Sequence, residues 1–452
     1  MKSSIVSKSL LFTALLAASS IAQQKVAITI YNENLALVHE TRSVEIPRGV
    51  NPVNFADVAA QIDPTSVQIK VVNSPASMQI LEQNYEYDLV NSSKIFEKYL
   101  EKEVKLVVKN GNEVTGKLLN AGSKDVVLQE EDGNLQIINA QEILSCDFPK
   151  LPDGLIARPT LVWEVNNTGA TNREIEVSYL TRGISWHAEY VGVLDENDAN
   201  MNLTGWVSID NKSGATYKEA KLKVVAGDVN LVQKQIRRTR VQAEMQLARA
   251  ADAGFQEKEF FEYHLYTLQR PATVRDNQVK QITFIPESKP AVTKRYVYEG
   301  QRDPRNASVL VEFKNEKSNG LGMALPAGKV RVYKADSDES LLFLGEDQIK
   351  HTPKDEEIRL TIGKAFDIIG EREILTERRL GKRAREQDIQ ITLRNHKNEA
   401  IKVTVVERSY GEWDVRNSST PVKKKTAQVA EWEINVPADG EAKLTFTIAN
   451  RW

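Results

Sequence analysis

The stretch that decides the fold is ISWHAEYVGVLDENDANMNLTGWVSID, residues 184–210. Apolar and polar residues alternate at both of its ends, and a cluster of Asp and Asn residues lies between them. An alternation of period two predicts a strand with one face in a core, and the Asp/Asn cluster predicts the turn between two antiparallel strands. Further strand-like stretches flank it, spaced about 12–18 residues apart as in a β-sandwich: TLVWEV (160–165), REIEVSYL (173–180) and EAKLKVV (219–225).

The same alternation continues to the C-terminus, so the second half of the chain is also expected to form sheets packed on one another. Residues 233–275 interrupt it with helix-forming residues and a small basic cluster, and we expect a helical or irregular excursion there. The later strand-like stretches are QITFI (281–285), VTKRYVYE (292–299), SVLVEF (308–313), KVRVY (329–333), EEIRLTI (356–362), DIQITL (388–393), IKVTVVE (401–407), AEWEINV (430–436) and KLTFTI (443–448).

Two smaller units are expected ahead of these sheets. Residues 24–90 contain alternating stretches such as VAITIY (26–31), typical of a small antiparallel domain. Residues 91–150 combine a short helix, expected at 93–102, with five short strands that are separated by turn residues. Five short strands with a glycine in the second resemble an SH3-like or Sm-like small barrel.

The predicted fold is therefore mainly β, with several antiparallel β-sandwiches, an SH3/Sm-like small barrel near the N-terminus and few helices. The length of 452 residues supports several domains, because it exceeds what one hydrophobic core usually organises. The expected segments are a signal peptide (1–22), an N-terminal β domain (24–90), the short helix with the small barrel (91–150), the first part of a β-sandwich (151–232), the excursion (233–275), the continuation of the sandwich (276–375) and a C-terminal β-sandwich (376–452).

The N-terminus has the features of an export signal. Lys2 and Lys8 flank a short charged region, Leu10 to Ala17 is an apolar run, and Ser20 and Ala22 supply the small residues that a signal peptidase requires. The run is about half of the roughly 20 apolar residues that a membrane-spanning helix needs. We therefore expect cleavage after Ala22, no transmembrane helix afterwards, and a periplasmic or secreted protein, with outer-membrane association as a further possibility.

Charge and cysteine content exclude several classes of function. Sixty basic and sixty-two acidic residues give a net charge of −2, so the chain lacks the positive excess that nucleic-acid binding requires. Its single cysteine, Cys146, cannot form an internal disulfide and is expected to be buried and inert. The stability of the fold must therefore come from the burial of apolar residues.

No motif for catalysis, cofactor binding or metal binding is present. The sequence contains no HExxH, GxSxG, CxxC or GxGxxG, and the nearest approach to a phosphate-binding loop, residues 322–329, is better explained as a turn before a strand. The nearest candidates for chemistry are His351, Asp355 and Glu356, because an imidazole and carboxylates on one loop can bind a metal or transfer protons. The alternative is a charged connection between strands. We therefore predict no cofactor, no metal and no catalytic residue.

Six stretches occur in order between residues 158 and 368: RPTLVWEV (158–165), SYLTRGISWHAEYVGVL (178–194), GWVSIDNKSGATYKEAKLKVVAGDVN (205–230), FEYHLYTLQRPATVRDNQVKQITF (261–284), GLGMALPAGKVRVYKAD (320–336) and FLGEDQIKHTPKDEEIRLTIGKAFDI (343–368). These stretches resemble a bacterial domain of unknown function that also forms the C-terminal part of mucoidy-inhibitor-like proteins. The resemblance implies an exported, β-rich domain and brings no activity, cofactor or catalytic residue. Those proteins have a coiled coil ahead of the shared domain, where this chain has the expected small barrel.

Three classes of function remain open from the sequence. The first is an exported cell-envelope protein that serves as a non-catalytic binding or scaffold module, with an envelope protein or a glycan as its partner. The second is an enzyme, a hydrolase or a metal-dependent one, with a site assembled from distant loops around His351. The third is a structural component associated with the outer membrane, because Leu444, Phe446, Ile448 and Trp452 resemble the closing strand of a membrane barrel.

Overall fold

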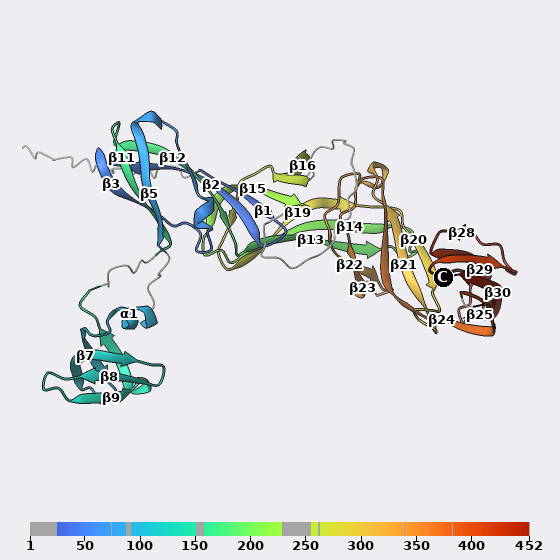
Figure 1. Cartoon of the computed structure of the whole chain (residues 1–452). Coiled ribbons are helices and arrows are strands. Elements are labelled where there is room, and N and C mark those ends of the chain that lie inside the picture. Colours follow the sequence, from blue (N-terminus) through green and yellow to red (C-terminus); the bar gives the residue numbers. More distant parts are fainter. Residues whose placement is uncertain are drawn as a thin grey trace, which may run out of the picture. The chain divides into compact units, whose positions relative to one another are not determined.

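The structure, a computed structural model, describes residues 25–73, 75–86, 92–150, 158–227, 255–260, 263–338, 340–381 and 383–451. The expected signal peptide, residues 1–22, lies outside the described residues. The described chain forms thirty strands and one α-helix, so the prediction of a mainly β fold with several antiparallel sheets is confirmed (Figure 1). Among the described residues, no helix is long and apolar enough to cross a membrane.

The chain divides into two compact units that interleave along the sequence. The first contains residues 25–27, 37–181 and 217–220, and the second contains residues 28–36, 182–216 and 221–451. Three strands, β1 (Lys25–Tyr31), β2 (Leu35–Glu45) and β15 (Tyr217–Ala226), contribute residues to both. The units therefore differ from the consecutive segments expected from the sequence.

Residues of the expected N-terminal domain share a sheet in the first unit with a strand from much later in the chain. The strand β11 pairs on one side with β3 and on the other with β5, antiparallel in both cases, so residues 24–90 do not form this sheet alone. The core of the sheet holds Phe55 against Trp163, with ring centroids 5.1 Å apart. The strands of this part are β3 (Gly49–Ala56), β4 (Gln68–Val71), β5 (Met78–Glu86), β11 (Thr160–Asn167) and β12 (Asn172–Thr181).

Residues 92–150 form a small helix-and-sheet module with its own core. The five expected strands are present in the order β10-β6-β7-β8-β9, while the assignment to an SH3-like or Sm-like barrel stays a prediction. The second strand requires a glycine at position 116, because a Cβ there would lie 2.7 Å from the carbonyl oxygen of Gln129. The elements are α1 (Ser92–Lys98), β6 (Glu103–Val108), β7 (Glu113–Ala121), β8 (Asp125–Gln129), β9 (Leu135–Asn139) and β10 (Ile143–Asp147).

Tyr99, directly after α1, joins the two ends of this module. Its side chain lies in the core, its ring contacts Phe148 at 4.8 Å, and its hydroxyl donates to the carbonyl oxygen of Lys150 at 2.6 Å. The same hydroxyl oxygen accepts from the backbone N–H of Lys150 at 3.1 Å. Cys146 is half-buried at the edge of this core, and burial raises the pKa of its thiol.

The deciding stretch forms the hairpin that its pattern predicts. The strands β13 and β14 pair antiparallel from Ile184–Asn211 to Leu194–Met201, at the centre of a five-stranded sheet. The order of this sheet is β19-β14-β13-β22-β23, and only the β13–β22 pair is parallel. The strands are β13 (Ile184–Leu194), β14 (Met201–Asn211), β19 (Gln278–Ser288), β22 (Gly328–Ala335) and β23 (Leu341–Ile349).

The expected helical or irregular excursion at 233–275 has a different structure in its described part. Residues 255–274 form strands β16 (Phe255–Phe260), β17 (Tyr263–Leu268) and β18 (Ala272–Val274), and β17 pairs with both β16 and β15. The helical expectation is wrong for these residues because Tyr266 and Leu268 alternate into the core, which outweighs the helix-forming residues before them.

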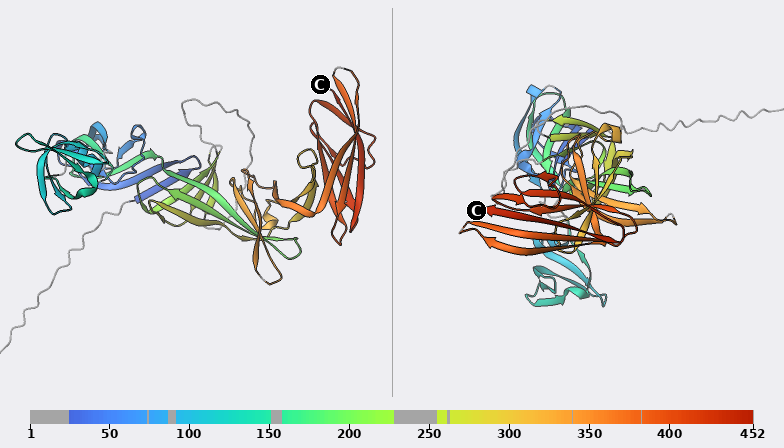
Figure 2. Two further views of the ribbon diagram at one scale, coloured as in Figure 1. Left: turned by 90° about the horizontal axis from the view of Figure 1, so that it is seen from below. Right: turned by 90° about the vertical axis from the view of Figure 1, so that its right-hand side faces the viewer.

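The C-terminal part forms one nine-stranded sheet in the order β27-β30-β25-β24-β21-β20-β26-β29-β28, whose orange and red strands lie alongside one another (Figure 2). Its longest strand runs through position 376, where the sequence suggested a boundary between two sandwiches. The strands are β20 (Thr293–Tyr298), β21 (Asn306–Lys314), β24 (Glu357–Arg379), β25 (Ala384–Asn395), β26 (Ile401–Arg408), β27 (Glu412–Arg416), β28 (Lys424–Lys425), β29 (Val429–Val436) and β30 (Gly440–Arg451).

Four buried asparagines repeat one device at the ends of strands. Asn167, Asn211, Asn315 and Asn395 are each at most 1% exposed, and each stands at or directly after the last residue of a strand. Every side-chain amide donates to two or more backbone carbonyls, as Asn395 does to those of Glu399 at 2.8 Å and Pro437 at 2.9 Å. Every amide oxygen accepts from a backbone N–H. The asparagines therefore fix the turns between strands without leaving buried polar groups unpaired.

Candidate functional site

A polar groove of about 650 Å³ lies over one face of the nine-stranded sheet. Side chains at alternate positions of four neighbouring strands point into it, while the residues between them, such as Tyr298 and Val405, are buried in the core. The alternation of strand residues thus gives the sheet an apolar face and a charged one. The groove is lined by Arg295, Val297, Glu299, Arg302, Asp303, Asn306, Ser308, Leu310, Glu312, Asp347, Arg359, Thr361, Gly363, Lys364, Thr404, Val406, Arg408 and Glu431.

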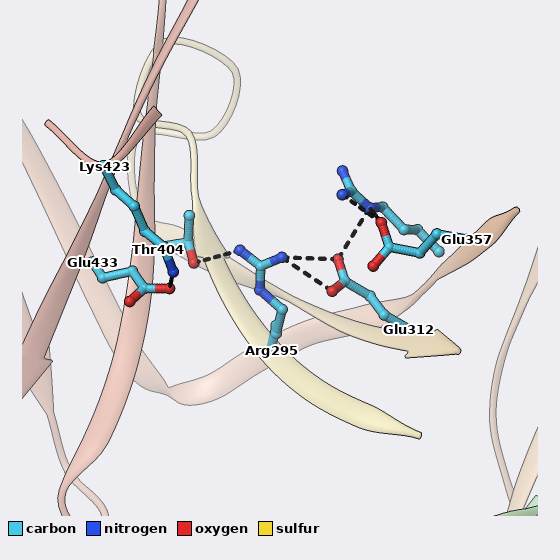
Figure 3. A network of polar contacts seen from close by, with 7 residues as sticks. Arg295, Glu312, Glu357, Thr404, Lys423 and Glu433 are labelled. Carbon is cyan, nitrogen blue, oxygen red and sulfur yellow. Dashed lines mark hydrogen bonds and ion pairs between the residues drawn. The ribbon is translucent and has the colours of Figure 1, made fainter. Parts of the chain in front are cut away.

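Glu312 is the centre of a charge network on the groove floor (Figure 3). Its carboxylate accepts two hydrogen bonds from Nη1 of Arg295, at 3.0 and 3.1 Å, and lies 3.3 Å from Nε of Arg359. Nη2 of Arg295 donates to the hydroxyl of Thr404 at 3.0 Å, and Arg359 also donates to Glu357 at 2.7 Å. Glu312 is only 7% exposed, so its charge is tolerated because two guanidinium groups compensate for its lost hydration.

The loop between β20 and β21 closes one end of the groove. Asp303 binds Lys364 and accepts from the backbone N–H groups of Arg305 at 3.1 Å and Asn306 at 3.0 Å. These bonds to the charged form, Lys364 first, hold the pKa of the Asp303 carboxyl well below its usual range. Arg302, next to it, contacts no carboxylate among the described residues and is exposed. The groove therefore includes an exposed guanidinium, that of Arg302.

A second ion pair lies on the core side of the same sheet. Glu407 is completely buried and accepts hydrogen bonds from Arg372, at 2.6 Å from Nη2, and from Gln301 at 2.6 Å. Burial raises the pKa of Glu407, and Arg372 acts in the opposite direction. Since Arg408, one residue later, lines the groove, β26 links this buried pair to the groove wall.

The three residues that the sequence marked for chemistry lie outside the groove. His351, Asp355 and Glu356 are exposed in the loop between β23 and β24, and the Nδ1 atom of His351 accepts from the backbone N–H of Ala327 at 3.1 Å. The buried Asn315 organises the rest of the loop, because its backbone pairs with Asp355 and Glu356 at 2.7 and 2.9 Å. In the described ranges no group of three or more His, Cys, Asp or Glu side chains could hold a metal ion.

The loop that approached a phosphate-binding motif is held in place by its neighbours. Tyr190 and Tyr266 donate to the carbonyl oxygens of Pro326 at 2.7 Å and Ala324 at 2.8 Å, and Glu257 accepts from the N–H of Ala324 at 3.1 Å. Because these bonds already use backbone groups of the loop, it serves as the entry to β22, as its turn residues predict.

The groove was not identified from the sequence. Hydroxyl groups of Ser308, Thr361 and Thr404 line it, and no histidine or cysteine is among the described lining residues. The arrangement offers charges of both signs over one sheet face.

Fold and groove together define a mainly β protein of antiparallel sheets with a charged groove on its C-terminal sheet. The chain belongs to the family of the domain of unknown function DUF4139, whose model matches residues 175–452. The matched part includes the whole five-stranded sheet and the whole nine-stranded sheet with the groove. A comparison with curated proteins finds no match.

Proposed function

We propose that this chain is an exported cell-envelope protein that binds a partner without transforming it, and that the groove is its binding surface. The observation that carries the proposal is the charge array around Glu312, which Arg295 contacts through hydrogen bonds and Arg359 through an ion pair before any ligand arrives. Side chains that are already ordered lose little conformational freedom on binding, so such an array favours affinity and orientation.

The charges of the groove indicate the chemistry of the partner. Both basic and acidic side chains line it, which suits a partner with groups of both signs, such as a protein surface or a glycan that bears carboxylates. Arg302 has donors available for a carboxylate, which a guanidinium binds through two parallel hydrogen bonds. The charged lining residues are Arg295, Arg302, Arg359, Lys364 and Arg408 with Glu299, Asp303, Glu312, Asp347 and Glu431.

The N-terminal sequence supports the envelope as the place of action. The charged region, the apolar run 10–17 and the small residues before Gln23 occur in the order of a cleaved signal, and the mature chain then begins at Gln23. The periplasm or the cell exterior, with outer-membrane association, is part of the same proposal. So is a relation to mucoidy-inhibitor-like proteins, which the stretches 178–194 and 205–230 support.

Site-specific photo-crosslinking in cells tests the groove. A photoreactive amino acid at Thr361, which is exposed in the groove, is expected to give a discrete crosslinked product in the envelope fraction. Arg302→Glu in the same chain should reduce that product at least threefold. The matched control is a photoreactive residue at Lys443, which is exposed on the same sheet but does not line the groove.

Equal crosslinking from Thr361 and Lys443, or a product insensitive to Arg302→Glu, would overturn the groove as the binding surface. Export is tested separately by N-terminal sequencing of the fractionated protein. Recovery of a chain that begins at Gln23 outside the cytoplasm is the expected result, and recovery of uncleaved Met1 in the cytoplasm contradicts it.

A further inference from the structure

Three segments that are distant in the sequence meet at one end of the nine-stranded sheet. Ala384, at the start of β25, pairs with Arg451 at the end of β30, and Arg451 pairs in turn with Glu412 at the start of β27. The turn from β24 to β25 closes beside them, since the N–H of Leu380 donates to the carbonyl oxygen of Ala384 at 2.9 Å. We call this end of the sheet the basic corner; its described residues are 379, 380, 383, 384, 410–412 and 451.

The basic corner has an excess of positive charge. Residues 378–385 are RRLGKRAR, with five basic residues and no acidic one. The nearest carboxylates of β25 already bind other arginines, as Glu386 binds Arg416 at 3.1 Å and Asp388 binds Arg378 at 3.0 Å. Three guanidinium groups are exposed and form no ion pair among the described residues: those of Arg379, Arg383 and Arg451.

Apolar side chains accompany these charges. A hollow of about 520 Å³ is lined by Arg383, Arg451 and Leu380, and Glu412 is the carboxylate in its described lining. Leu380 is 57% exposed in the turn, and Tyr410, in the turn before β27, is 76% exposed. A ligand that fits the corner therefore combines negative charge with an apolar part that covers these two side chains.

The backbone holds Tyr410 close to the end of β30. Gly411 has a φ of +77°, and a Cβ there would lie 2.9 Å from the carbonyl oxygen of Arg451. A side chain at position 411 would push the turn away from β30, so only glycine allows this approach. The exposed ring and the guanidinium of Arg451 are thus parts of one surface.

The guanidinium groups of the corner lie on both faces of the sheet. Arg379 pairs with Arg385, whereas Arg451 pairs with Ala384, the preceding residue of β25. Paired residues of antiparallel strands point to the same face, and successive residues point to opposite faces. Arg379 and Arg451 therefore point to opposite faces. A partner that contacts both must lie across the end of the sheet, as a flat surface does, because an added strand or a small ligand covers only one face.

We propose that the basic corner binds the surface of a membrane that contains anionic lipids. The guanidinium groups contact lipid phosphates through paired hydrogen bonds, while Leu380 and Tyr410 enter the boundary between headgroups and acyl chains. Each basic side chain near such a surface strengthens binding about fivefold. The inference rests on the proposed function only in placing the chain at the envelope, since no described residue of the corner lines the groove.

Co-sedimentation of the mature chain, residues 23–452, with lipid vesicles tests the proposal. Vesicles of phosphatidylcholine and phosphatidylglycerol in equal parts should bind the chain, and vesicles of phosphatidylcholine alone should bind it at least tenfold more weakly. Because salt screens exposed charges, binding to the anionic vesicles should also weaken at least tenfold between about 0.1 M and about 0.5 M sodium chloride.

Charge variants show whether the corner is responsible. Arg379→Gln with Arg383→Gln should weaken binding to the anionic vesicles at least tenfold. The matched control, Lys402→Gln with Lys443→Gln, makes the same change in net charge at exposed positions of the same sheet and should weaken binding no more than twofold. Glu412→Gln removes the carboxylate of the hollow and should strengthen binding about twofold.

An apolar variant separates a membrane from a soluble polyanion. Leu380→Ser should weaken vesicle binding at least threefold. The control Phe366→Ser, at a 93% exposed phenylalanine near the opposite end of the pairing between β24 and β25, should leave it unchanged. Thermal melting of each variant checks the fold.

Three results would overturn the proposal. The first is equal binding to the two kinds of vesicle, and the second is an equal loss in the arginine and lysine pairs of substitutions. The third is binding of soluble polyphosphate as tight as that of the vesicles and insensitive to Leu380→Ser, which would make a soluble polyanion the ligand. None of these results alters the crosslinking expected from Thr361, so the two proposals fail separately.

Discussion

The nine-stranded sheet and the small module of residues 92–150 both present a charged hollow, but they hold their charges differently. In the groove of the large sheet, opposite charges on adjacent strands bind one another around the buried Glu312. The hollow of the module, about 1010 Å³, is wide and mostly acidic, with Lys117 as the basic residue in its described lining. Its acidic residues are Glu103, Glu113, Glu130, Glu131 and Asp132.

The difference indicates what fixes the positions of charged side chains on the surface of a sheet. Charges of one sign on strand ends and turns repel each other and stay hydrated, so their positions remain weakly defined. Charges of both signs on neighbouring strands fix each other, provided that the opposite face of the sheet supplies a core. The large sheet has such a core of nineteen buried residues, and the module has one of seven.

The largest expected effect comes from that core. Trp432→Ala should lower the free energy of unfolding of the nine-stranded sheet by about 4 kcal/mol, because its indole is completely buried and stacks on Phe446 at 4.6 Å. Urea unfolding followed by hydrogen exchange of β25 amides measures it. Tyr410→Ala, at a 76% exposed ring, is the control and should change little. A loss below 1 kcal/mol for Trp432→Ala would contradict the account.

The next largest loss of stability is expected from substitution of a buried asparagine. Asn395→Ala leaves the carbonyls of Glu399 and Pro437 without donors, and we expect a loss of about 3 kcal/mol. Asn395→Asp should not restore it, since a carboxylate cannot donate to those carbonyls. The control is Asn435→Ala, at an exposed position of the same sheet, measured in the same urea titration. Equal losses at 395 and 435 would remove the asparagine from the explanation.

In the module, a smaller and local effect is expected. Tyr99→Phe removes the hydroxyl that contacts the backbone of Lys150, which should cost about 1 kcal/mol in module stability. Hydrogen exchange should therefore quicken in β6 and β7 and stay unchanged in β25. If exchange in β25 changed equally, the module would not be an independent cooperative unit.

The acid dependence of the groove should be a modest effect. The folded-state pKa of Asp303 is lowered, so its contribution to stability is present above the unfolded-state pKa and is lost as pH falls through the folded value. Asp303→Asn should therefore lower the unfolding midpoint at pH 7, and the difference from the unmodified chain should shrink below about pH 4. A difference that is constant from pH 7 to pH 2 would show that Lys364 does not act through the charge of Asp303.

The smallest effect on stability is expected in the charged loop between β23 and β24, which belongs neither to the groove nor to the module. His351→Ala removes one hydrogen-bond acceptor at an exposed site. The free energy of unfolding should fall by about 0.5 kcal/mol, and the metal content of the purified chain should not change. Metal analysis of the purified chain provides the check. Near-stoichiometric zinc that is lost in His351→Ala would contradict this expectation and favour the enzyme that the sequence left open.

The sequence was sufficient to predict individual strands, but it did not show which distant strands pair with one another. The alternation in 184–210 predicted a hairpin that the structure contains, and the turn residues of 103–148 predicted five strands. Alternation also places Arg295 and Thr404 on strands, but it does not show that these two strands pair. The groove therefore could not be predicted, because it depends on pairing between distant segments.

The candidate loop was misleading for a related reason. His351, Asp355 and Glu356 stand out as a polar cluster in a linear reading, yet the residue that organises their loop is Asn315, which lies 37 positions before Thr352. Nothing near Asn315 in the sequence distinguishes it from an ordinary turn residue. Its role follows from burial and from its carbonyl partners, which only the folded chain brings together.

The parallel pairing of β20 with β26 has a consequence for the time course of folding. Arg295 and Thr404, which meet across this pair, are 109 positions apart, and three other strands of the sheet, β21, β24 and β25, lie between them in the chain. Closing so long a segment costs entropy before any contact compensates for it, so sheets of this kind fold slowly. During synthesis from the N-terminus, β20 cannot pair with β26 until residues 401–408 have been made. The charged groove is therefore one of the last parts of the molecule to form.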